Sequence, residues 1–467
     1  MPRVVVVGAG LSGLAAAYRI RAAVPGAALT VLDRNPRPGG HVWTESADGF
    51  TAELGPNGIF DAKPHTLRLC RELGLGDRLV PAAEAARKNR FLFLDGRLHR
   101  LPASPLGVLT TPVLSPRGRL ALLAEPFRRR PGTVPADETV AAFARRRFGR
   151  EAADTFVDAL VTGVQAGDPE RLSVAAAFPR LPAYEAEAGS VLRGALRAAR
   201  RRRREARAAG EPPPGPRQLW SFREGLRVLI EELARRLSDA VRLGEDVRRL
   251  ERAGAGWVVR GAGGEWPADA VVLTTPADHQ AGLVAGLDPD LAREMAAVPY
   301  APVAVAALGY RRADVAGPQD GFGYIAPGNT GRDVLGVQWC SSIFPDRAPP
   351  GFVLWRALCG GARRGDVLAW DDDTLVRRVH AEMTVAMGVT GEPVFRRVVR
   401  WPRAIPQYVV GHAARVARVE ARAAAFPGLF PAGSAYHGVA MNDCTEQAEG
   451  LAERVRAFLA GPAAGGG

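Results

Sequence analysis

The residues whose types and spacing could do chemistry begin with a glycine-rich turn near the start of the chain. Glycines stand at positions 8, 10 and 13, after the valine run 4–7, and Asp33 follows Gly13 by twenty residues. This is the spacing of a dinucleotide-binding turn: Gly8 permits a tight turn, Gly10 lets the backbone approach a pyrophosphate, and Gly13 lets a helix pack close to a strand. Unpaired N–H groups at the helix start would face the phosphates, and Asp33 would accept hydrogen bonds from a ribose.

Three further glycine-containing segments help to distinguish FAD from NAD as the expected dinucleotide. Gly39-Gly40 follows Asp33, a glycine-containing loop covers 53–58, and the segment 432–443 precedes a predicted helix near the C-terminus. NAD and FAD share the first fingerprint. Several separated segments that converge on one ligand indicate an extended FAD rather than a nicotinamide dinucleotide held by one unit.

The elements that must position these residues begin with a βαβ half-unit. The β-branched run 4–7 predicts a buried parallel strand, 14–23 a helix and 28–32 a second strand. Further strands are predicted near 241–243, 257–259, 270–274, 303–308, 352–358 and 429–430, and helices near 64–79, 374–388 and 445–460. The fold class is therefore α/β, and α+β when the whole chain is considered.

Residues 91–190 have a different texture. Prolines punctuate short helical pieces that pair leucines with arginines, which predicts a mainly helical inserted domain. Residues 193–207 then carry eight arginines in fifteen positions, followed by a proline-rich stretch at 211–216. The simplest interpretation is a solvated helix end plus a linker, and contact with a membrane or polyanion is the alternative. The glycine-rich residues 462–467 are expected to form a flexible tail.

Length and composition restrict the class of protein. The chain has 467 residues, 47% hydrophobic and 24% charged, which suggests about three globular domains and excludes wholesale disorder, collagen and coiled coil. Its four cysteines form no CxxC pair, which argues against a disulfide scaffold, a zinc module or an iron–sulfur site. No apolar stretch reaches 18 residues, so no transmembrane helix is predicted, although contact with a membrane surface stays open.

The net charge of +13 comes almost entirely from arginine, because Lys63 and Lys88 are the only lysines. Such a charge suits a soluble basic protein, an anionic membrane surface, anionic substrates or nucleic acid. No zinc finger or aromatic RNA-binding motif is present, so we expect no nucleic-acid partner.

The sequence resembles the protoporphyrinogen oxidase family, within the wider class of amine-oxidase-like flavoproteins, over nearly its whole length. Several of the matching segments are peculiar to that family, and together they are far more specific than the glycine fingerprint. They are 4–13, Glu53-Leu54-Gly55-Pro56, Asn89-Arg90-Phe91-Leu92 with Leu101-Pro102, Ala166-Gly167-Asp168 with Leu172-Ser173, Gly321-Phe322-Gly323, Ile405-Pro406-Gln407-Tyr408 with Gly411-His412, and Gly438-Val439 with Asn442-Asp443-Cys444.

The resemblance implies three domains. A Rossmann-type FAD-binding domain would consist of residues 1–88, 222–282 and 409–461. A mixed-sheet substrate-binding domain would consist of 89–92 and 283–408, and a helical membrane-associating insertion of 93–192. Residues 193–221 would form a basic, proline-rich linker.

The resemblance also implies roles for single residues. Arg90 matches the arginine that pairs with a substrate propionate, a task that suits a planar and permanently charged guanidinium. Leu160, Gly163 and Phe322 match positions that line the macrocycle. No catalytic side chain and no metal ligand are implied. Cofactor contacts are expected at Gly8, Gly10, Leu11, Ser12, Gly13, Asp33, Arg34, Gly39, Gly40, Gly55, Pro56, Asn57, Val247, Gly433, Val439 and Met441.

The implied activity is a flavoprotein oxidase of haem biosynthesis. One non-covalent FAD per chain would take a hydride from a methylene bridge of protoporphyrinogen IX, and O2 would reoxidise the flavin to give H2O2. Three such rounds would produce protoporphyrin IX. The resemblance places the protein in the cytoplasm, peripherally on the inner face of the cell membrane, with a homodimer as an open alternative.

Three departures from the family pattern affect the expected cofactor contacts. Ser434 stands where many relatives have asparagine, Glu224-Gly225 replaces a glycine pair, and Asp33 stands where glutamate is commoner. FAD binding is still expected, with altered individual contacts.

Three other functions compete with this interpretation. A coproporphyrinogen III oxidase would do the same chemistry on a substrate with four propionates, and would need more cationic anchors around the ring. Many amine oxidases use a lysine near the flavin, and this chain has none after Lys88. A flavin- or porphyrin-binding protein without turnover is the third alternative.

Overall fold

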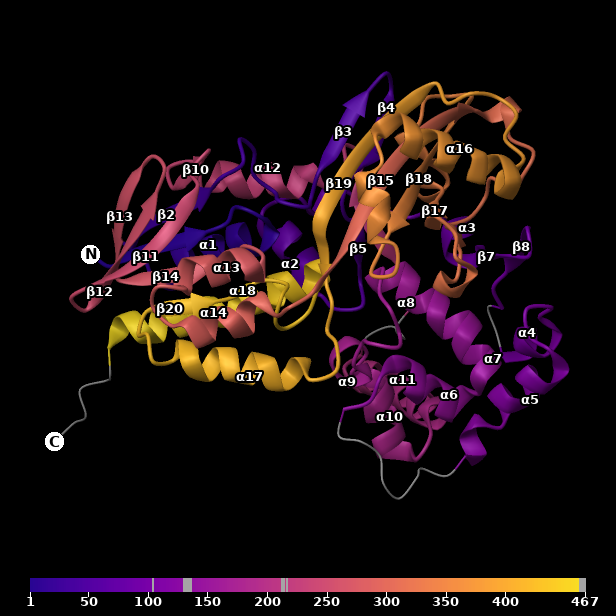
Figure 1. The fold of residues 1–467 in the computed structure, drawn as a ribbon, viewed down its shortest axis with the longest axis horizontal. Coiled ribbons are helices and arrows are strands. Elements are labelled where there is room, and N and C mark those ends of the chain that lie inside the picture. Colours follow the sequence, from indigo (N-terminus) through magenta and orange to yellow (C-terminus); the bar gives the residue numbers. More distant parts are fainter. Residues whose placement is uncertain (103–104, 129–136, 211–214, 216, 462–467) are drawn as a thin grey trace.

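The computed structural model describes residues 1–102, 105–128, 137–210, 215 and 217–461. Figure 1 separates the chain into three parts: a sheet flanked by helices at the left, a second sheet at the upper right, and a group of short helices at the lower right. Two long strands, coloured orange, run between the left and upper parts. The predicted α/β character is confirmed.

A five-stranded parallel sheet forms the centre of the left part. Its strands lie in the order β10 (Val241–Leu243), β2 (Ala28–Asp33), β1 (Arg3–Val7), β14 (Ala270–Leu273) and β20 (Leu429–Pro431). The predicted strands at the N-terminus, near 241–243, 270–274 and 429–430 are thus confirmed. All come from the ranges 1–88, 222–282 and 409–461, so distant parts of the chain meet at one sheet edge.

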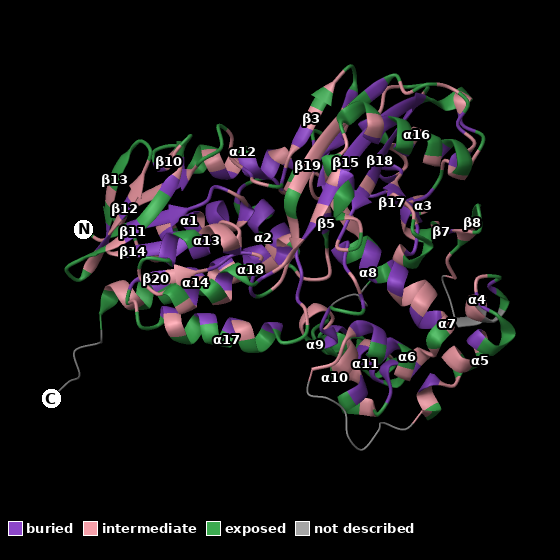
Figure 2. Cartoon of the chain, viewed as in Figure 1, coloured by how far each residue is buried: buried purple, intermediate pink, exposed green. Residues whose placement is uncertain are grey.

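Both faces of this sheet are covered. One face packs on α1 (Leu11–Ala23), α2 (His65–Glu72), α12 (Arg227–Arg236) and α18 (Met441–Ala460). The other packs on a three-stranded antiparallel sheet and on three helices, namely β11 (Val247–Ala253), β12 (Gly256–Gly261), β13 (Gly264–Ala268), α13 (Ala277–Val284), α14 (Pro289–Ala296) and α17 (His412–Ala423). Figure 2 shows the buried strands enclosed by these layers. Burial on two faces explains why β1 is a continuous valine run.

The upper part is built on a seven-stranded mixed sheet. Its order is β19 (Phe395–Pro406), β15 (Tyr300–Arg311), β18 (Phe352–Gly360), β17 (Val334–Gln338), β16 (Gly323–Ile325), β7 (Arg90–Leu94) and β8 (Arg97–Arg100). Neighbours are antiparallel except β16 and β7. Helix α16 (Asp372–Met387) packs on one face. The opposite face packs in part on β4 (Phe50–Glu53) and on the end of α8 (Asp158–Gln165).

The described residues between β8 and β9 (Leu219–Phe222) are helical. They form α4 (Pro105–Thr110), α5 (Pro116–Leu123), the turn η2 (Glu125–Phe127), α6 (Val140–Phe148), α7 (Arg150–Ala152), the π-turn η3 (Ala153–Val157), α8 (Asp158–Gln165), α9 (Val174–Ala177), α10 (Arg180–Ala188) and α11 (Val191–Ala208). The expectation of a mainly helical insertion is confirmed. Across the described residues, no helix combines the length and apolar character that crossing a membrane would require.

Of the expected linker at 193–221, residues 193–208 are helical, as the interpretation of a solvated helix end predicted, and residues 219–221 belong to β9. Residues 193–208 belong to α11, which begins at the side-chain cap of Ser190 and buries Gly194, Ala198 and Ala206. Gly194 lets α11 approach α10, because a Cβ there would lie 2.5 Å from the carbonyl oxygen of Tyr184. Buried small residues separated by four and by eight positions give the arginine-rich helix a packing face. Most of the proline-rich stretch, and the tail 462–467, lie outside the described residues.

Short elements connect these parts. The helix predicted over 64–79 stops early: α2 ends at Glu72, and Gly74 at φ +79° turns the chain toward a strand. The remaining elements are β3 (Thr44–Ala47), β4 (Phe50–Glu53), β5 (Ile59–Phe60), β6 (Leu79–Pro81), α3 (Glu84–Lys88), α15 (Cys340–Ile343) and the turns η1 (Gly76–Arg78), η4 (Arg312–Asp314), η5 (Gly328–Thr330), η6 (Pro345–Arg347) and η7 (Gly365–Ala369). Strands β5, β9 and β6 form a small antiparallel sheet.

Candidate active site

The glycine-rich turn joins β1 to α1 as its spacing predicts. Gly8 has φ +110°, and its N–H donates to the carbonyl of Leu32. A Cβ at Gly13 would lie 1.8 Å from the carbonyl oxygen of Gly8, so only glycine lets the helix start this close to the strand. Gly10 caps α1 without a side-chain hydrogen bond, and Leu11 and Ser12 open the helix. The first N–H groups of α1 are therefore available to an anion.

The other predicted cofactor segments gather around this turn. Gly10 forms a β-bridge with Gly39, whose N–H donates to the carbonyl of Ala9. A Cβ at Gly40 would lie 3.3 Å from the Cα of Gly10. From the far end of the chain, Gly433 lies against Thr274, whose hydroxyl donates to the carbonyl of Gly8. Four separated segments thus meet where a dinucleotide would lie.

The start of α18 completes this arrangement. Val439 precedes it and Met441 is its first residue. The side chain of Cys444, one turn into α18, hydrogen-bonds Ser12 at the start of α1. The two helix starts, one from each end of the sequence, therefore lie side by side.

Asp33 ends β2 at the same sheet edge. Its carboxylate accepts from the N–H of Ala9 at 2.7 Å and from the backbone and side chain of Asn35 at 2.8 Å. The carbonyl of Asp33 accepts from the N–H of Glu245, two residues before Val247. Burial lowers the pKa of the His279 imidazole on α13, and the nearby positive charge of Arg34 lowers it further. Asp33, Arg34 and Val247 thus form one neighbourhood, beyond the turn.

The loop after β4 contains the predicted contacts Gly55, Pro56 and Asn57. Asn57 is buried, and its Nδ2 has no hydrogen-bond partner among the described residues. A buried amide donor without an acceptor is costly for the protein alone. The polar edge of a bound flavin would supply such an acceptor. Together with the glycine cradle and the open helix start, this unpaired donor shows that the residues fit a flavin dinucleotide.

A buried ion pair holds this loop, and the sequence did not reveal it. The carboxylate of Glu53 accepts from the Arg347 guanidinium at 3.2 Å, from the Thr44 hydroxyl at 2.7 Å and from the N–H of Leu226 at 2.8 Å. Both charged side chains are fully buried. Burial raises the pKa of Glu53, and the Arg347 charge and the two donors oppose that shift.

Arg356 of β18 is a second buried arginine at the same loop. Its Nη1 donates to the carbonyl of Glu53 at 3.0 Å and to that of Gly55. Burial lowers the pKa of Arg356. Neither arginine could have been found from the sequence, because each stands among ordinary residues of a turn or a strand and its role depends on which loop it meets.

The predicted substrate residues Arg90 and Phe322 lie together. Arg90 begins β7, Gly323 pairs with it in register, and the guanidinium carbon lies 4.8 Å from the centre of the Phe322 ring. The Arg90 side chain is exposed and has no carboxylate partner among the residues that the structure describes. Phe322 packs with Leu219, Ile343 and neighbouring apolar residues. The pair offers a free cation beside an aromatic face.

Leu160 and Gly163 lie on α8, across from the same sheet. Leu160 is 44% exposed although it is apolar. A Cβ at Gly163 would lie 2.5 Å from the side chain of Ile325, so this glycine brings α8 onto β16. The helix therefore lies next to the strand that begins directly after Phe322, and the sequence-predicted ring-lining residues are held on adjoining elements.

The sheet register reveals a row that the sequence did not show. Arg90, Gly323, Gln338 and Arg356 are direct partners on β7, β16, β17 and β18. Residues in direct register point to the same face, and neighbouring strands are about 4.8 Å apart, so the row spans about 14 Å. It links the free cation at Arg90 to the loop at Gly55. A flat ligand on this face would therefore lie beside the loop at Gly55.

Comparison with known proteins places this geometry in a family. The model of the flavin containing amine oxidoreductases matches residues 11–456. The chain belongs to the flavin containing amine oxidoreductase family. This membership makes the protein a flavin-dependent oxidoreductase.

Individual members of the amine oxidoreductase family are similar over almost the full length. Protoporphyrinogen oxidase 1 of Arabidopsis thaliana is 31% identical over 97% of this chain and 88% of its own. The coproporphyrinogen III oxidase of Bacillus subtilis is 28% identical over 98% of each chain. A crystal structure from Exiguobacterium sp. 255-15, provisionally named a protoporphyrinogen oxidase, superposes with a TM-score of 0.83, 26% identity and coverage of 97% and 98%.

Proposed function

We propose that this chain is a protoporphyrinogen oxidase that binds one FAD non-covalently and converts protoporphyrinogen IX to protoporphyrin IX in haem biosynthesis. The observation that carries the proposal is a combination of features. Glycine segments at 8–13, 39–40 and 433 that fit a flavin dinucleotide converge at one sheet edge, and a guanidinium with no carboxylate partner among the described residues lies over an aromatic ring beside the second sheet. Relatives that carry this activity in their names support it.

The chemistry divides between cofactor and protein. When bound, FAD supplies the hydride acceptor for a methylene bridge and a route for the electrons to O2, so that three O2 become three H2O2 while the substrate loses six hydrogens. Arg90 would hold a propionate and fix the register of the ring. Phe322 and Leu160 would give it flat apolar contact. The pyrrole N–H protons leave to solvent, and we assign no general base.

The same site supports a second substrate, coproporphyrinogen III. Leu219 packs with Phe322 in one apolar cluster, and Arg217 stands two residues before it. The pKa of Arg217 is lowered by burial and by the charges of Arg180 and Arg202. A group of cations close in sequence to Leu219 would suit a substrate with four propionates, and the similarity to the Bacillus subtilis protein supports this alternative.

The test is anaerobic reduction of the purified protein with each porphyrinogen in turn. We expect a yellow protein whose flavin absorbance bleaches with at least one of them and returns when O2 is admitted. Faster bleaching by coproporphyrinogen at equal concentration would favour the second substrate. A colourless protein that cannot be loaded with FAD, or a flavin that neither substrate reduces, would overturn the proposal.

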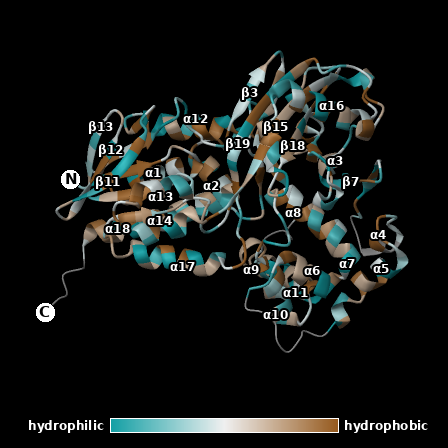
Figure 3. Cartoon of the chain, viewed as in Figure 1, coloured by the Kyte–Doolittle hydropathy of each residue, from teal (hydrophilic) through white to brown (hydrophobic). Residues whose placement is uncertain are grey.

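We propose further that the helical part rests on the inner face of the cell membrane. Apolar side chains are exposed on three neighbouring elements, α5, η2 and the start of α11, which we call the apolar edge: Leu120 (68%), Leu123, Phe127 (81%), Leu192 and Leu196 (59%). Figure 3 shows apolar and polar positions side by side on these helices. Arg193 lies among them, with its guanidinium carbon 5.8 Å from the Phe127 ring. Apolar side chains beside arginines suit an anionic lipid surface.

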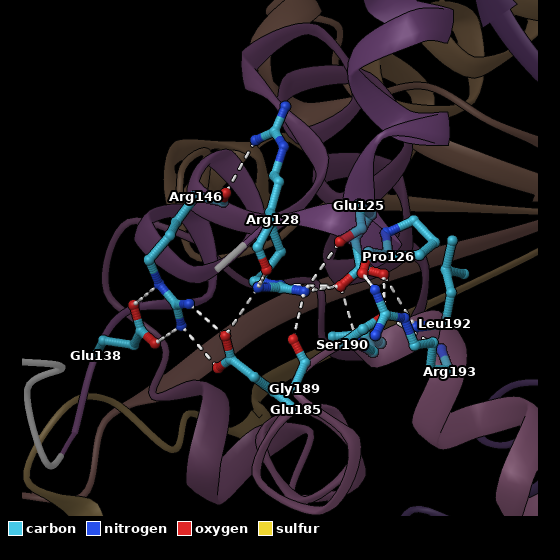
Figure 4. A network of polar contacts seen from close by, with 12 residues as sticks. Glu125, Pro126, Arg128, Glu138, Arg146, Glu185, Gly189, Ser190, Leu192 and Arg193 are labelled. Carbon is cyan, nitrogen blue, oxygen red and sulfur yellow. Dashed lines mark hydrogen bonds and ion pairs between the residues drawn. The ribbon is translucent and has the colours of Figure 1, made fainter. Parts of the chain in front are cut away.

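A buried polar network holds this apolar edge in place (Figure 4). The Glu125 carboxylate pairs with Arg147, and neither side chain is exposed to solvent. The same carboxylate accepts from the Ser190 hydroxyl at 2.6 Å and from the N–H groups of Val191 and Leu192. It thus caps α11 and ties it to η2. The network therefore holds the elements that carry Phe127 and Leu196 next to each other.

A further inference from the structure

The segment Gln407–His412 follows β19 and contains a family motif to which the proposed function gives no role. It lies where three parts of the molecule meet. On one side, Val409 forms a β-bridge with Leu172 of the helical part, and the carbonyl of Tyr408 accepts from the N–H of Ser173 at 2.8 Å. The Gln407 side chain donates to the carbonyl of Gln165, at the end of α8, at 2.9 Å.

On its other side, the segment meets the loop that leads into α18. The Tyr408 hydroxyl donates to the carbonyl of Ser434 at 2.7 Å and accepts from the N–H of Gly438 at 2.6 Å. A single hydroxyl therefore bridges the two ends of a five-residue stretch. Tyr408 is buried, so both bonds are shielded from water.

The Tyr408 ring is itself held. It stacks on the His412 ring with 3.9 Å between centroids and 13° between planes. Nε2 of His412 donates to the carbonyl of Tyr436, the residue midway between Ser434 and Gly438. The stacked side chains of Tyr408 and His412 thus hydrogen-bond the loop backbone at every second residue, namely 434, 436 and 438.

The far side of the loop is fixed as well. The Tyr436 hydroxyl donates to the side chain of Gln280 at 3.0 Å, and that side chain donates to the carbonyl of Ala432 at 2.9 Å. Gly433 and Gly438 have φ values of +101° and +126°. Because glycine can adopt many other backbone conformations, the loop would leave this one readily if nothing held it. Without the clamp, a ligand would have to order this loop on binding.

We propose that Tyr408 is a positioning residue for FAD, whose hydroxyl holds the 433–439 loop and the start of α18 in the conformation that receives the cofactor. The inference rests on the proposed function, because the loop matters only if the protein binds FAD. It also gives a role to the segment Gln407–His412. This segment contacts both the 433–439 loop and the end of α8, the helix that carries Leu160 and Gly163.

The variant that isolates the hydroxyl is Tyr408→Phe, which keeps the stacked ring and removes both hydrogen bonds. A matched control is Tyr310→Phe. Tyr310 is also buried, stacks on a histidine, His380, and places its hydroxyl 3.1 Å from Nδ1 of that ring, but it lies in the core on the α16 side of the second sheet. The two variants remove the same atom from similar surroundings.

The measurement is FAD release from the purified holoenzyme, followed by flavin fluorescence on dilution, together with the visible circular dichroism of bound flavin. Leaving a buried carbonyl and N–H without their partner predicts that Tyr408→Phe raises the dissociation constant for FAD about ten-fold or more. The dichroism should also change. Tyr310→Phe should match the wild type in both readouts, even if its melting temperature falls.

Equal FAD release from Tyr408→Phe and wild type would overturn the inference. If Tyr408→Phe does not yield a folded protein, Tyr436→Phe decides, because it frees the same loop from Gln280. We expect faster FAD release from it, and unchanged release would overturn the inference. Failure of the wild type to bind FAD would instead overturn the proposed function, so the two failures are distinguishable.

Discussion

At the scale of single residues, the site depends on side chains left without a partner inside the protein. The Arg90 guanidinium has an aromatic neighbour but no carboxylate among the described residues, and Asn57 keeps a buried donor unpaired. Proteins pair most buried polar groups internally, so the Asn57 amide is a donor that a bound ligand could satisfy, while the exposed Arg90 charge is open to an anionic group. Arg90 is the residue through which such a ligand can be tested most directly.

Arg90→Glu should raise KM for the porphyrinogen with little change in kcat. Loss of a charge-assisted hydrogen bond is worth about 1.5–3 kcal/mol, and the exposure of Arg90 places the effect toward the lower figure, or about ten-fold in KM. Steady-state oxidation rates measure it. Arg97→Glu is the control, because Arg97 is an exposed arginine on β8 of the same hairpin. An unchanged KM in Arg90→Glu would remove its role.

The buried His412 predicts a pH dependence of stability. Burial lowers the pKa of His412 from its ordinary value of 6.5. If Nδ1 were protonated, its N–H would find no acceptor among the described residues. Below pH 6.5 the His412 imidazole therefore binds a proton in the unfolded chain but not in the folded chain. The free energy of unfolding consequently falls as the pH falls. One such proton is worth at most about 1.4 kcal/mol per pH unit.

Melting temperatures of wild type and His412→Gln between about pH 7 and pH 5 test this. We expect a shallower acid slope in the variant. His437→Gln is the control, since His437 is an exposed histidine paired with Glu420. If the slopes of wild type and His412→Gln coincide, the folded protein does not hold His412 neutral.

At the scale of elements, the arginine-rich helix α11 packs through its small residues and exposes apolar ones. Its small residues pack on α10, its N-terminus is capped by Ser190 and by the Glu125 carboxylate, and Leu192 and Leu196 remain exposed. The arginines on the rest of the helix surface are mostly exposed to solvent. A helix with both features suits attachment to a surface better than a free linker would.

Phe127→Ser combined with Leu196→Ser should weaken binding to anionic lipid vesicles. The two side chains are 81% and 59% exposed, and their insertion into the lipid interface would be lost. Co-sedimentation with vesicles at low salt measures the effect, and added salt should release the wild type. The control is Val385→Ser, an exposed apolar residue on α16. Equal sedimentation of all three proteins, or none of the wild type, would contradict membrane attachment.

At the scale of the whole molecule, the Glu53–Arg347 pair joins the two sheets. Glu53 ends β4 and also accepts from Leu226, just before α12 of the first part. Arg347 belongs to η6, between strands of the second sheet, and donates to the Ser221 hydroxyl on β9. The pair therefore fixes the loop at Gly55 between the parts that would hold cofactor and substrate.

Breaking this pair should cost more than removing it. Arg347→Met leaves the Glu53 carboxylate buried without its counter-charge, which predicts a loss of about 3–5 kcal/mol in the free energy of unfolding. The double variant Glu53→Gln with Arg347→Met should lose clearly less. Urea unfolding of the wild type, both single variants and the double variant measures the coupling. Additive losses would show that the two charges do not depend on each other.

The sequence by itself determined the local features of this protein. The valine run, the glycine spacing and Asp33 specify a strand, a turn and a helix through short-range sterics and hydrogen bonds, and the structure confirms each of them. Motif resemblance correctly led to the family, because several short segments each carry a local constraint. The predicted domain boundaries and the individual cofactor contacts stay predictions.

Only the tertiary structure decided which distant residues meet. The burial of Arg347 and Arg356, the row from Arg90 to Arg356, and the Tyr408–His412 clamp all depend on contacts between residues far apart in the chain. The packing of α11 depends in the same way on α10, and the charge run did not reveal it. The physical reason is that burial, register and long-range hydrogen bonds are properties of the assembled chain, which local sequence patterns do not contain.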